Sequence, residues 1–315
     1  MAAAAPPLVV LVGPTGSGKS DLALTVAERC AGELVNCDSV QIFRGFDIGA
    51  AKTPFAERRG IRHHLIDAAD PSALFTAGDY ARQARAALAD ITARGRLPIV
   101  VGGTGFYLRA LTDGLFEGPP RDEALRARLA ARQARRPGAL HRLLARFDPS
   151  AARRIHANDV QKTTRALEVI LAERRPLTEV LAERARDALT GYRMLKLGLN
   201  PPREALYSRL DDRATRMFAA GALENEVRAL LARGVPLGAK PFESLGYAQA
   251  LALVQGKLGK NEAIAATQLE TRRYAKRQWT WFRRDRDIVW LDGFGADPAI
   301  AADAIYRVES FLSAR

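Results

Sequence analysis

The octapeptide GPTGSGKS, residues 13–20, is the feature that most limits what this chain can fold into. It follows the apolar run LVVLV (8–12) and precedes SDLALTVAERC (20–30), whose apolar residues recur at helical spacing, so we predict a strand, a loop and a helix. Glycines in such a loop let backbone N–H groups turn inward, and the helix N-terminus favours an anion. The pattern predicts a phosphate-binding loop formed by Gly13, Pro14, Thr15, Gly16, Ser17, Gly18, Lys19 and Ser20.

Further strand and helix signals follow the loop. GELVNCD (32–38) and RLPIVVGGTG (96–105) each predict a short buried strand, and the segment 76–95 between them has a helical pattern that ends in glycine. Repeated strand–helix units predict an α/β fold, a doubly wound parallel sheet like that of P-loop NTPases. Ligands of such sheets bind beyond the carboxyl ends of the strands, where the candidate motifs fall.

The pattern changes between about 116 and 190, where Arg-rich helical segments follow one another without a strand. Strand-like runs resume with MLKLGLN (194–200) and end with DIVWLD (287–292). We therefore predict a catalytic core made of residues 1–115 and 191–315, with a helical insertion at residues 116–190.

The net charge of +13 and the isoelectric point near 10.2 indicate a polyanionic partner. Scattered arginine on solvated helices would mean little, but the charge is clustered. Residues 121–165 hold twelve Lys or Arg against four Asp or Glu, and RRYAKRQWTWFRRDR (272–286) holds seven Lys or Arg. The two segments predict nucleic-acid contacts.

No apolar run reaches the length of a membrane helix, so we expect a cytoplasmic protein without a membrane partner. Cys30 and Cys37 stand at no metal-ligand spacing and are interpreted as core thiols. The adjacent His63 and His64 also lack ligands at metal spacing, which favours a structural role.

A nucleotide-hydrolysing enzyme with this loop would need a carboxylate at the end of a later apolar strand to position Mg²⁺. The strand in LPIVVGGTG ends in Gly-Gly-Thr instead, and the acidic residue follows an earlier strand as Asp38. From the sequence pattern, Asp38 could be a base acting on an acceptor, a metal ligand, or only a turn or N-cap residue. A small-molecule kinase remains an alternative at this point.

Seven motifs, in order along nearly the whole chain, resemble the bacterial tRNA dimethylallyltransferases, also called tRNA isopentenyltransferases or IPP transferases. They are GPTGSGKSDLAL (13–24), NCDSVQIFRGFDIGAAK (36–52), VVGGTGFYLRAL (100–111), RRIHANDVQKTTRALEV (153–169), DRATRMFAAGALENEV (212–227), SLGYAQAL (244–251) and YAKRQWTWFRR (274–284).

The resemblance implies that the loop holds the pyrophosphate of dimethylallyl diphosphate rather than ATP. The implied reaction attaches the dimethylallyl group to N6 of adenosine 37 in the tRNA anticodon loop and releases pyrophosphate. A related enzyme class, the adenylate isopentenyltransferases, prenylates free AMP or ATP instead. The Arg-rich insertion and the basic C-terminal helix argue against that alternative, because a mononucleotide acceptor does not need them.

The resemblance also implies roles for individual residues. Asp38 would accept the proton of the adenine amine, with Thr104 orienting a substrate and Arg213 clamping the diphosphate, while Lys19 and Ser20 would serve the leaving group, Ser20 through Mg²⁺. The residues implied to contact tRNA are Asp38, Ser39, Val40, Gln41, Thr104, Arg126, Gln161, Lys162, Thr163, Thr164, Arg165, Lys276 and Arg277.

One position departs from the family pattern. PFESLGY has Glu243 where a basic residue is usual, so an RNA contact there is not expected. Nothing in the sequence calls for more than a monomer.

Overall fold

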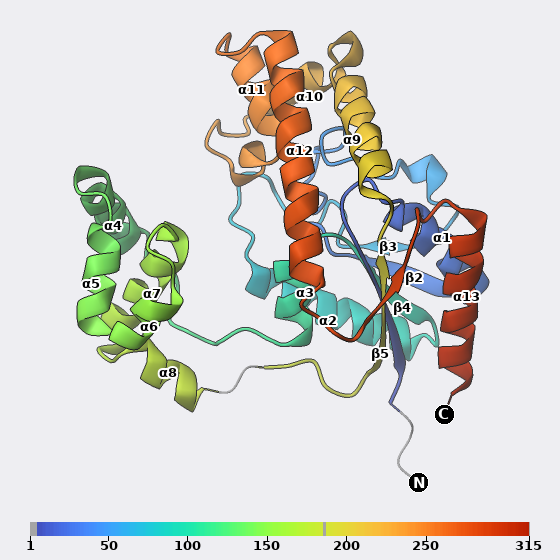
Figure 1. The fold of residues 1–315 in the computed structure, drawn as a ribbon, viewed down its shortest axis with the longest axis horizontal. Coiled ribbons are helices and arrows are strands. Elements are labelled where there is room, and N and C mark those ends of the chain that lie inside the picture. The colour runs from blue at the N-terminus through green and yellow to red at the C-terminus, as the bar shows by residue number, and fades with distance from the viewer. Residues whose placement is uncertain (1–4, 185–186, 315) are drawn as a thin grey trace. The chain divides into compact units, whose positions relative to one another are not determined.

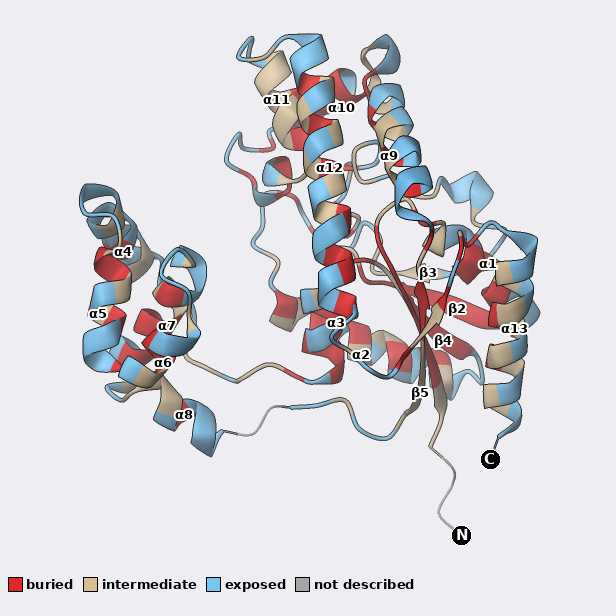
Figure 2. Cartoon of the chain, in the orientation of Figure 1, coloured by how far each residue is buried: buried red, intermediate tan, exposed pale blue. Residues whose placement is uncertain are grey.

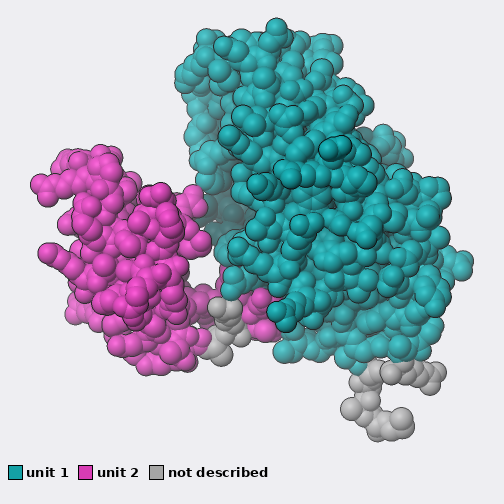
Figure 3. Space-filling view, viewed as in Figure 1, with its two compact units in different colours: residues 1–112, 189–315 teal, residues 113–188 magenta. Residues whose placement is uncertain are grey.

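The computed structural model describes residues 5–184 and 187–314 (Figure 1). The chain forms two compact units, coloured separately in Figure 3. Unit 1 comprises residues 1–112 and 189–315, and unit 2 comprises residues 113–188. None of the described helices combines the length and the apolar composition that crossing a bilayer requires.

Unit 1 is built on one six-stranded sheet in which every pairing is parallel. The strand order is β3-β2-β4-β1-β5-β6, and Val9 of the central strand pairs with Ile99 on one side and Leu195 on the other. The strands are β1 (Pro7–Val12), β2 (Gly32–Asn36), β3 (His63–His64), β4 (Leu97–Val101), β5 (Arg193–Leu199) and β6 (Ile288–Leu291). The expected mixed α/β fold is therefore present.

Helices enclose this sheet, which explains why its central strands are apolar on both faces (Figure 2). The α-helices of unit 1 are α1 (Lys19–Arg29), α2 (Ala77–Ala93), α3 (Gly105–Thr112), α9 (Arg203–Met217), α10 (Ala222–Ala232), α11 (Tyr247–Val254), α12 (Lys260–Phe282) and α13 (Pro298–Ser313). Three 3₁₀ turns, η1 (Phe55–Glu57), η2 (Ala219–Gly221) and η3 (Lys240–Glu243), complete the unit.

Local sequence explains several element boundaries. The side chain of Thr76 accepts a hydrogen bond from the backbone N–H of Asp79, and the Asp79 carboxylate accepts one from the backbone of Thr76, so this capping box starts α2. The core between the sheet, α1 and α13 contains Val9, Leu22 and Val308. The buried face of α1 thus packs in this core, which supports the loop that precedes the helix.

Unit 2 consists of helices in its described residues. They are α4 (Glu123–Arg135), α5 (Ala139–Phe147), α6 (Pro149–Arg154), α7 (Val160–Glu173) and α8 (Leu177–Glu183). Their core is small and aliphatic, with Leu144 and Leu167 completely buried. Asp148 ties the unit together, because one carboxylate oxygen caps α6 at the N–H of Ala151 and the other accepts from the N–H of Thr178, 2.7 Å away.

The expected strands and long helices lie close to their observed positions, but several shorter elements and the last helix were missed. The two-residue strand β3 is too short to have a pattern, and α3 follows Gly-rich sequence. The segment after residue 293 gave no expectation, yet it forms α13, whose apolar residues pack against α1. The functional assignment of unit 2 as a tRNA-binding insertion remains a prediction.

Candidate functional site

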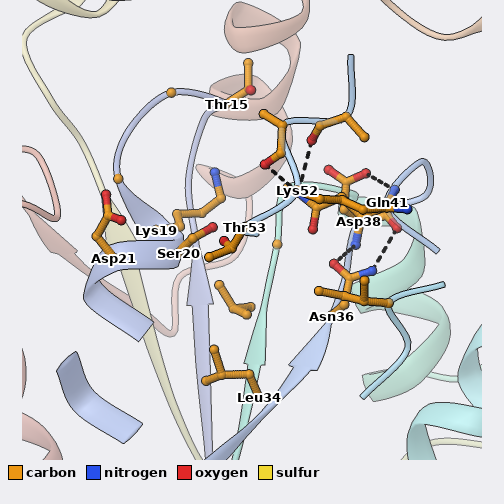
Figure 4. Close-up of a pocket in the computed structure, with 18 of the residues that line it drawn as sticks. Thr15, Lys19, Ser20, Asp21, Leu34, Asn36, Asp38, Gln41, Lys52 and Thr53 are labelled. Carbon is orange, nitrogen blue, oxygen red and sulfur yellow. Dashed lines mark hydrogen bonds between the residues drawn. The ribbon is translucent and has the colours of Figure 1, made fainter. Parts of the chain in front are cut away.

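Three loops of unit 1 follow the carboxyl ends of adjacent strands. Residues 13–20 follow β1, residues 37–41 follow β2 and residues 102–104 follow β4. Because the strands are parallel neighbours, their loops meet at one edge of the sheet. They line a pocket of about 320 Å³ (Figure 4), in which Lys19 and Ser20 face Asp38 from the neighbouring loop.

The first loop has the backbone that the octapeptide predicts. Gly16 and Gly18 have φ values of 80° and 85°, in the left-handed region that favours glycine. A side chain at Gly18 would also approach the backbone N of Gly295 to 3.0 Å. Helix α1 starts at Lys19, so its N-terminal N–H groups point into the pocket side of the loop.

Two positively charged side chains lie partly buried at this loop. The Nζ of Lys19 donates to the backbone oxygen of Pro14 at 2.7 Å, and Nη2 of Arg213 donates to Oγ1 of Thr15 at 2.8 Å. Among the described residues, neither side chain forms an ion pair with a carboxylate. Two desolvated cations without a carboxylate partner favour an anionic ligand.

The pKa values of Lys19 and Arg213 reflect the removal of both side chains from solvent. Desolvation lowers the pKa of Lys19 to about 8, against the opposing effect of the Asp38 charge. Desolvation also lowers the pKa of Arg213 to about 10, with Asp38 opposing and Arg209 and Arg216 contributing. An incoming anion would therefore stabilise the charged form of both side chains.

Arg213 is the middle residue of an arginine stripe on α9. Arg209 and Arg216, four residues before and three residues after it, also line the pocket of about 320 Å³. Spacings of three and four residues place them on one helix face. Sequence analysis singled out only Arg213, although this spacing could have identified the other two.

Asp38 combines a structural contact with a free carboxylate oxygen. Its Oδ1 accepts hydrogen bonds from the backbone N–H groups of Val40 at 2.8 Å and Gln41 at 3.3 Å. No described residue donates a hydrogen bond to Oδ2. The turn-capping interpretation of Asp38 is therefore correct, and the second oxygen stays available for a proton or a ligand.

Asp38 also lies where two pockets meet. A second pocket, of about 410 Å³, shares Thr15, Asp38, Ala50 and Arg213 with the first. Its remaining walls are more apolar and come from η3, α9 and α12, with Leu210, Met217, Leu245, Thr271, Tyr274 and Arg277 among them. The free carboxylate is thus accessible from both pockets.

Thr104 connects the loops after β2 and β4. Its Oγ1 accepts from the backbone N–H of Ser39 at 3.0 Å and lies 3.3 Å from Oγ of the same residue. Burial and the Asp38 charge raise the pKa of Tyr274, whereas a hydrogen bond with Thr104 lowers it. Thr104 therefore contacts the loop that carries Asp38, and its predicted role in orienting a substrate remains a prediction.

Two further residues of the site went unrecognised in the sequence. Gln278 lines the first pocket and is 4% exposed, although its motif was interpreted as an RNA contact. Lys52 also lines that pocket (Figure 4). Its Nζ pairs with Asp47 and Asp67 at 2.8 and 2.5 Å. Lys52 is thus a fully paired cation that orders residues 43–67.

The predicted tRNA-contact residues of unit 2 fall into exposed and buried groups. Lys162 and Gln161 are exposed at the start of α7, where Nζ of Lys162 lies 2.5 Å from Asp159. Thr163 is completely buried, so its side chain packs inside the unit instead of facing a ligand. Thr164 is partly exposed.

Arg126 and Arg165 share one buried carboxylate in unit 2. Nε and Nη2 of Arg126 each donate to Glu168 at 2.9 Å, and Nη1 of Arg165 donates at 2.6 Å. Burial raises the pKa of Glu168, but the hydrogen bonds from both arginines outweigh it and bring the pKa to about 2. These arginines therefore support the packing of unit 2, and their role in tRNA contact remains a prediction.

The predicted metal ligand of unit 1 is Ser20. The described residues contain no group of three or more His, Cys, Asp or Glu side chains that could hold a metal ion. The Ser20 hydroxyl is exposed at the start of α1, and no described residue hydrogen-bonds to it. His64 is paired with Glu33 at 2.7 Å, which agrees with the structural role expected for this histidine.

The family model "IPP transferase" matches residues 41–285 of the chain. A tRNA dimethylallyltransferase of Solibacter usitatus (strain Ellin6076) is 62% identical over 306 residues, which is 97% of this chain and 99% of the relative. One from Koribacter versatilis (strain Ellin345) is 54% identical over the same shares. The chain belongs to the IPP transferase family, so the resemblance seen in its motifs is confirmed.

Solved structures lead to the same family. The full-length tRNA isopentenylpyrophosphate transferase of Bacillus halodurans is 35% identical with a TM-score of 0.70, covering 98% of this chain and 95% of its own. A eukaryotic dimethylallyltransferase captured acting on tRNA is 28% identical with a TM-score of 0.79, covering 98% and 80%. The fold described above is therefore the fold of tRNA-modifying transferases.

Proposed function

We propose that this protein transfers the dimethylallyl group of dimethylallyl diphosphate to N6 of adenosine 37 in a tRNA anticodon loop and releases pyrophosphate. The observation that carries the proposal is the pair of partly buried, desolvated cations at the phosphate-binding loop, Lys19 and Arg213, which form no ion pair with a carboxylate among the described residues. A diphosphate would supply the missing negative charge. The protein acts on tRNA as a monomer in the cytoplasm.

The first pocket suits the diphosphate. Charge builds up on the leaving pyrophosphate as the allylic C–O bond breaks, so donors fixed at its oxygens stabilise the transition state. Lys19, the loop N–H groups and the arginine stripe of α9 provide these donors. Ser20 would hold Mg²⁺, which prefers a few protein oxygens together with phosphate and water, and which when bound would neutralise part of the phosphate charge.

The second pocket suits the acceptor adenine. The exocyclic amine of adenine is a weak nucleophile, because its lone pair is delocalised into the ring, and it must lose a proton as the C–N bond forms. Asp38 has a free Oδ2 at the junction of the two pockets. Asp38 therefore accepts the amine proton while the amine attacks the allylic carbon from the second pocket.

The target base must leave the anticodon stack before it can enter this pocket, at a cost of a few kcal/mol. Contacts with RNA phosphates offset that cost. Lys276 and Arg277 are exposed on α12, and Arg277 lines the second pocket. Lys162 is exposed on unit 2. We assign these side chains to tRNA binding.

The alternative acceptor, free AMP or ATP, gains no support from the relatives, whose names specify tRNA. The test is transfer of label from radiolabelled dimethylallyl diphosphate, without ATP, to unmodified tRNA carrying A36-A37-A38, run beside AMP. Label in tRNA alone supports the proposal. Label in AMP, or in neither acceptor, contradicts it.

A further inference from the structure

Gln278 lies in the last two turns of α12 and bonds to two of the loops that form the site. The backbone N–H of Thr15 donates to Oε1 of Gln278 at 2.7 Å, and Nε2 of Gln278 donates to the backbone oxygen of Gly103 at 2.8 Å. Only this orientation of the amide group satisfies both partners, because one loop offers a donor and the other an acceptor. Gln278 thus joins the phosphate loop to the loop after β4.

The loop after β4 accommodates this contact at a specific residue. A Cβ atom at Gly103 would lie 2.1 Å from Nε2 of Gln278, which is far inside van der Waals contact. Any other residue at 103 would displace the glutamine amide. The two hydrogen bonds of Gln278 therefore require a glycine at position 103.

The contacts continue on both sides of Gln278. Thr15, held through its N–H, accepts from Arg213 through its Oγ1 at 2.8 Å. Thr104, next to Gly103, accepts from the N–H of Ser39, which follows Asp38. The leaving-group side of the site, with Arg213, is thereby connected through Gln278 to the acceptor side, with Asp38.

Burial separates Gln278 from its neighbours on the same helix. Lys276 and Arg277 are exposed, whereas Gln278 is 4% exposed and points into the protein. A buried amide with both polar atoms bonded to loops cannot also contact a surface-bound RNA. In the motif YAKRQW, Lys276 and Arg277 are therefore available to a bound RNA, whereas the adjacent Gln278 connects two loops of the site.

We infer that Gln278 is a positioning residue for prenyl transfer: it sets the phosphate loop at a fixed distance from the loop of Gly103 and Thr104, and so sets the diphosphate relative to Asp38. This inference rests on the proposed function. Reacting atoms must meet in a narrow geometry, and a displacement of about 1 Å can cost up to roughly a hundredfold in rate. An untethered phosphate loop also binds its anion less tightly, because the loop must be ordered on binding.

The first test replaces Gln278 with methionine, which keeps the volume and removes both hydrogen bonds. We expect kcat with saturating tRNA and dimethylallyl diphosphate to fall by about tenfold or more, and the Kd for pyrophosphate with Mg²⁺ to rise by about fivefold. The Kd for tRNA should stay within about twofold, since the exposed face of α12 is unchanged. Gln268→Met is the matched control, because Gln268 lies on the same helix but bonds to Asp211 and Thr215.

The second test uses Gly103→Ala, which should displace the Gln278 amide and reproduce the same losses. The double variant Gly103→Ala/Gln278→Met should then lose no more than either single variant. A merely structural glutamine would lower the melting temperature while leaving kcat and the pyrophosphate Kd unchanged.

Values of kcat and pyrophosphate Kd within about twofold of wild type for Gln278→Met, or additive losses in the double variant, would overturn the inference. If Gln278→Met does not fold, the isosteric Gln278→Glu takes its place in the test. This variant keeps the oxygen that accepts from the N–H of Thr15, but it replaces the donor to the Gly103 oxygen with a carboxylate oxygen. The measurement of pyrophosphate Kd does not depend on a prenyl acceptor. It therefore tests the role of Gln278 even if the wild-type protein fails to prenylate tRNA and the proposed function is wrong.

Discussion

Units 1 and 2 both contain partly buried positive charges, but the charges are neutralised by a carboxylate only in unit 2. In unit 2, Arg126 and Arg165 converge on Glu168, whose side chain is 1% exposed. In unit 1, Lys19 and Arg213 bond only to a backbone oxygen and a hydroxyl in the described structure. The first arrangement is complete within the protein, whereas the second lacks its negative partner.

The difference separates structural from ligand-binding arginines more clearly than sequence motifs do. A cation that already holds a buried carboxylate has its charge satisfied, and removing the carboxylate leaves the cation uncompensated. A buried cation without such a partner reduces the stability of the empty protein and favours an anionic ligand. On this basis we assign anion binding to Lys19 and Arg213 and structural support to the cluster around Glu168.

The largest expected effect concerns Asp38, whose carboxylate lines the same pocket as the unpaired cations. Asp38→Ala and Asp38→Asn should each lower turnover by roughly a hundredfold or more, because both remove the base, with tRNA binding nearly intact. Asparagine can still cap the turn at Val40 and Gln41. If Asp38→Asn kept wild-type turnover while Asp38→Ala lost it, Asp38 would be a turn residue only. Loss of tRNA affinity equal to the loss of rate would also exclude the base.

The next effect is on stability and falls in unit 2. Glu168→Gln should lower the free energy of unfolding of this unit by about 3 kcal/mol, because two arginines lose their charge partner. Hydrogen exchange of peptides from residues 113–188 measures it. Glu179→Gln, which removes a surface pair with Arg175, should cost less than about 1 kcal/mol. Pyrophosphate binding should not change in either variant, and equal losses of stability would contradict the comparison.

The lowered pKa of Glu168 gives this unit a pH dependence of known sign. A carboxyl group whose pKa falls on folding, here from 4.5 to about 2, adds stability that is complete above pH 4.5. That stability is lost as the pH decreases from about 4.5 to 2. The loss should be absent in Glu168→Gln, which cannot titrate.

A smaller effect is expected from the pKa of Lys19. A lysine with a pKa of about 8 is protonated at pH 7 and neutral at pH 9, so it loses the charge that holds the anion. The affinity for pyrophosphate should fall by about tenfold between pH 7 and pH 9. Lys19→Met should bind weakly at both pH values without that slope, which controls for the titration of pyrophosphate. A wild-type affinity independent of pH would separate Lys19 from the ligand.

The smallest effects concern the exposed cations. Lys162→Ala and Arg277→Ala should each weaken tRNA binding a few-fold and reduce the dependence of affinity on salt by about one ion. Arg29→Ala, at an exposed pair with Glu309, is the control. Unaltered affinity in either variant would remove its segment from the interface.

Much of this arrangement could be predicted from the sequence where local pattern decides the structure. The β1–loop–α1 unit follows from a buried run, glycines and a helix, and the parallel order places Asp38 and Thr104 at the same edge. The contacts of Gln278 could not be predicted, because they depend on packing between segments far apart in the chain, whereas Arg209 and Arg216 could have been found from their helical spacing to Arg213. The pairing of Arg126 with Glu168 was hidden for the same reason, since a charged motif alone does not tell which charges are already compensated.

The central claim is that the unpaired cations of unit 1 hold a diphosphate rather than ATP. Calorimetric titration of wild type and Arg213→Met with pyrophosphate and with ATP, both with Mg²⁺, tests it most directly. We predict that wild type binds pyrophosphate at least about tenfold more tightly than ATP, and that Arg213→Met loses most of this affinity without loss of thermal stability. Equal or tighter binding of ATP, or unchanged pyrophosphate affinity in Arg213→Met, would contradict the claim.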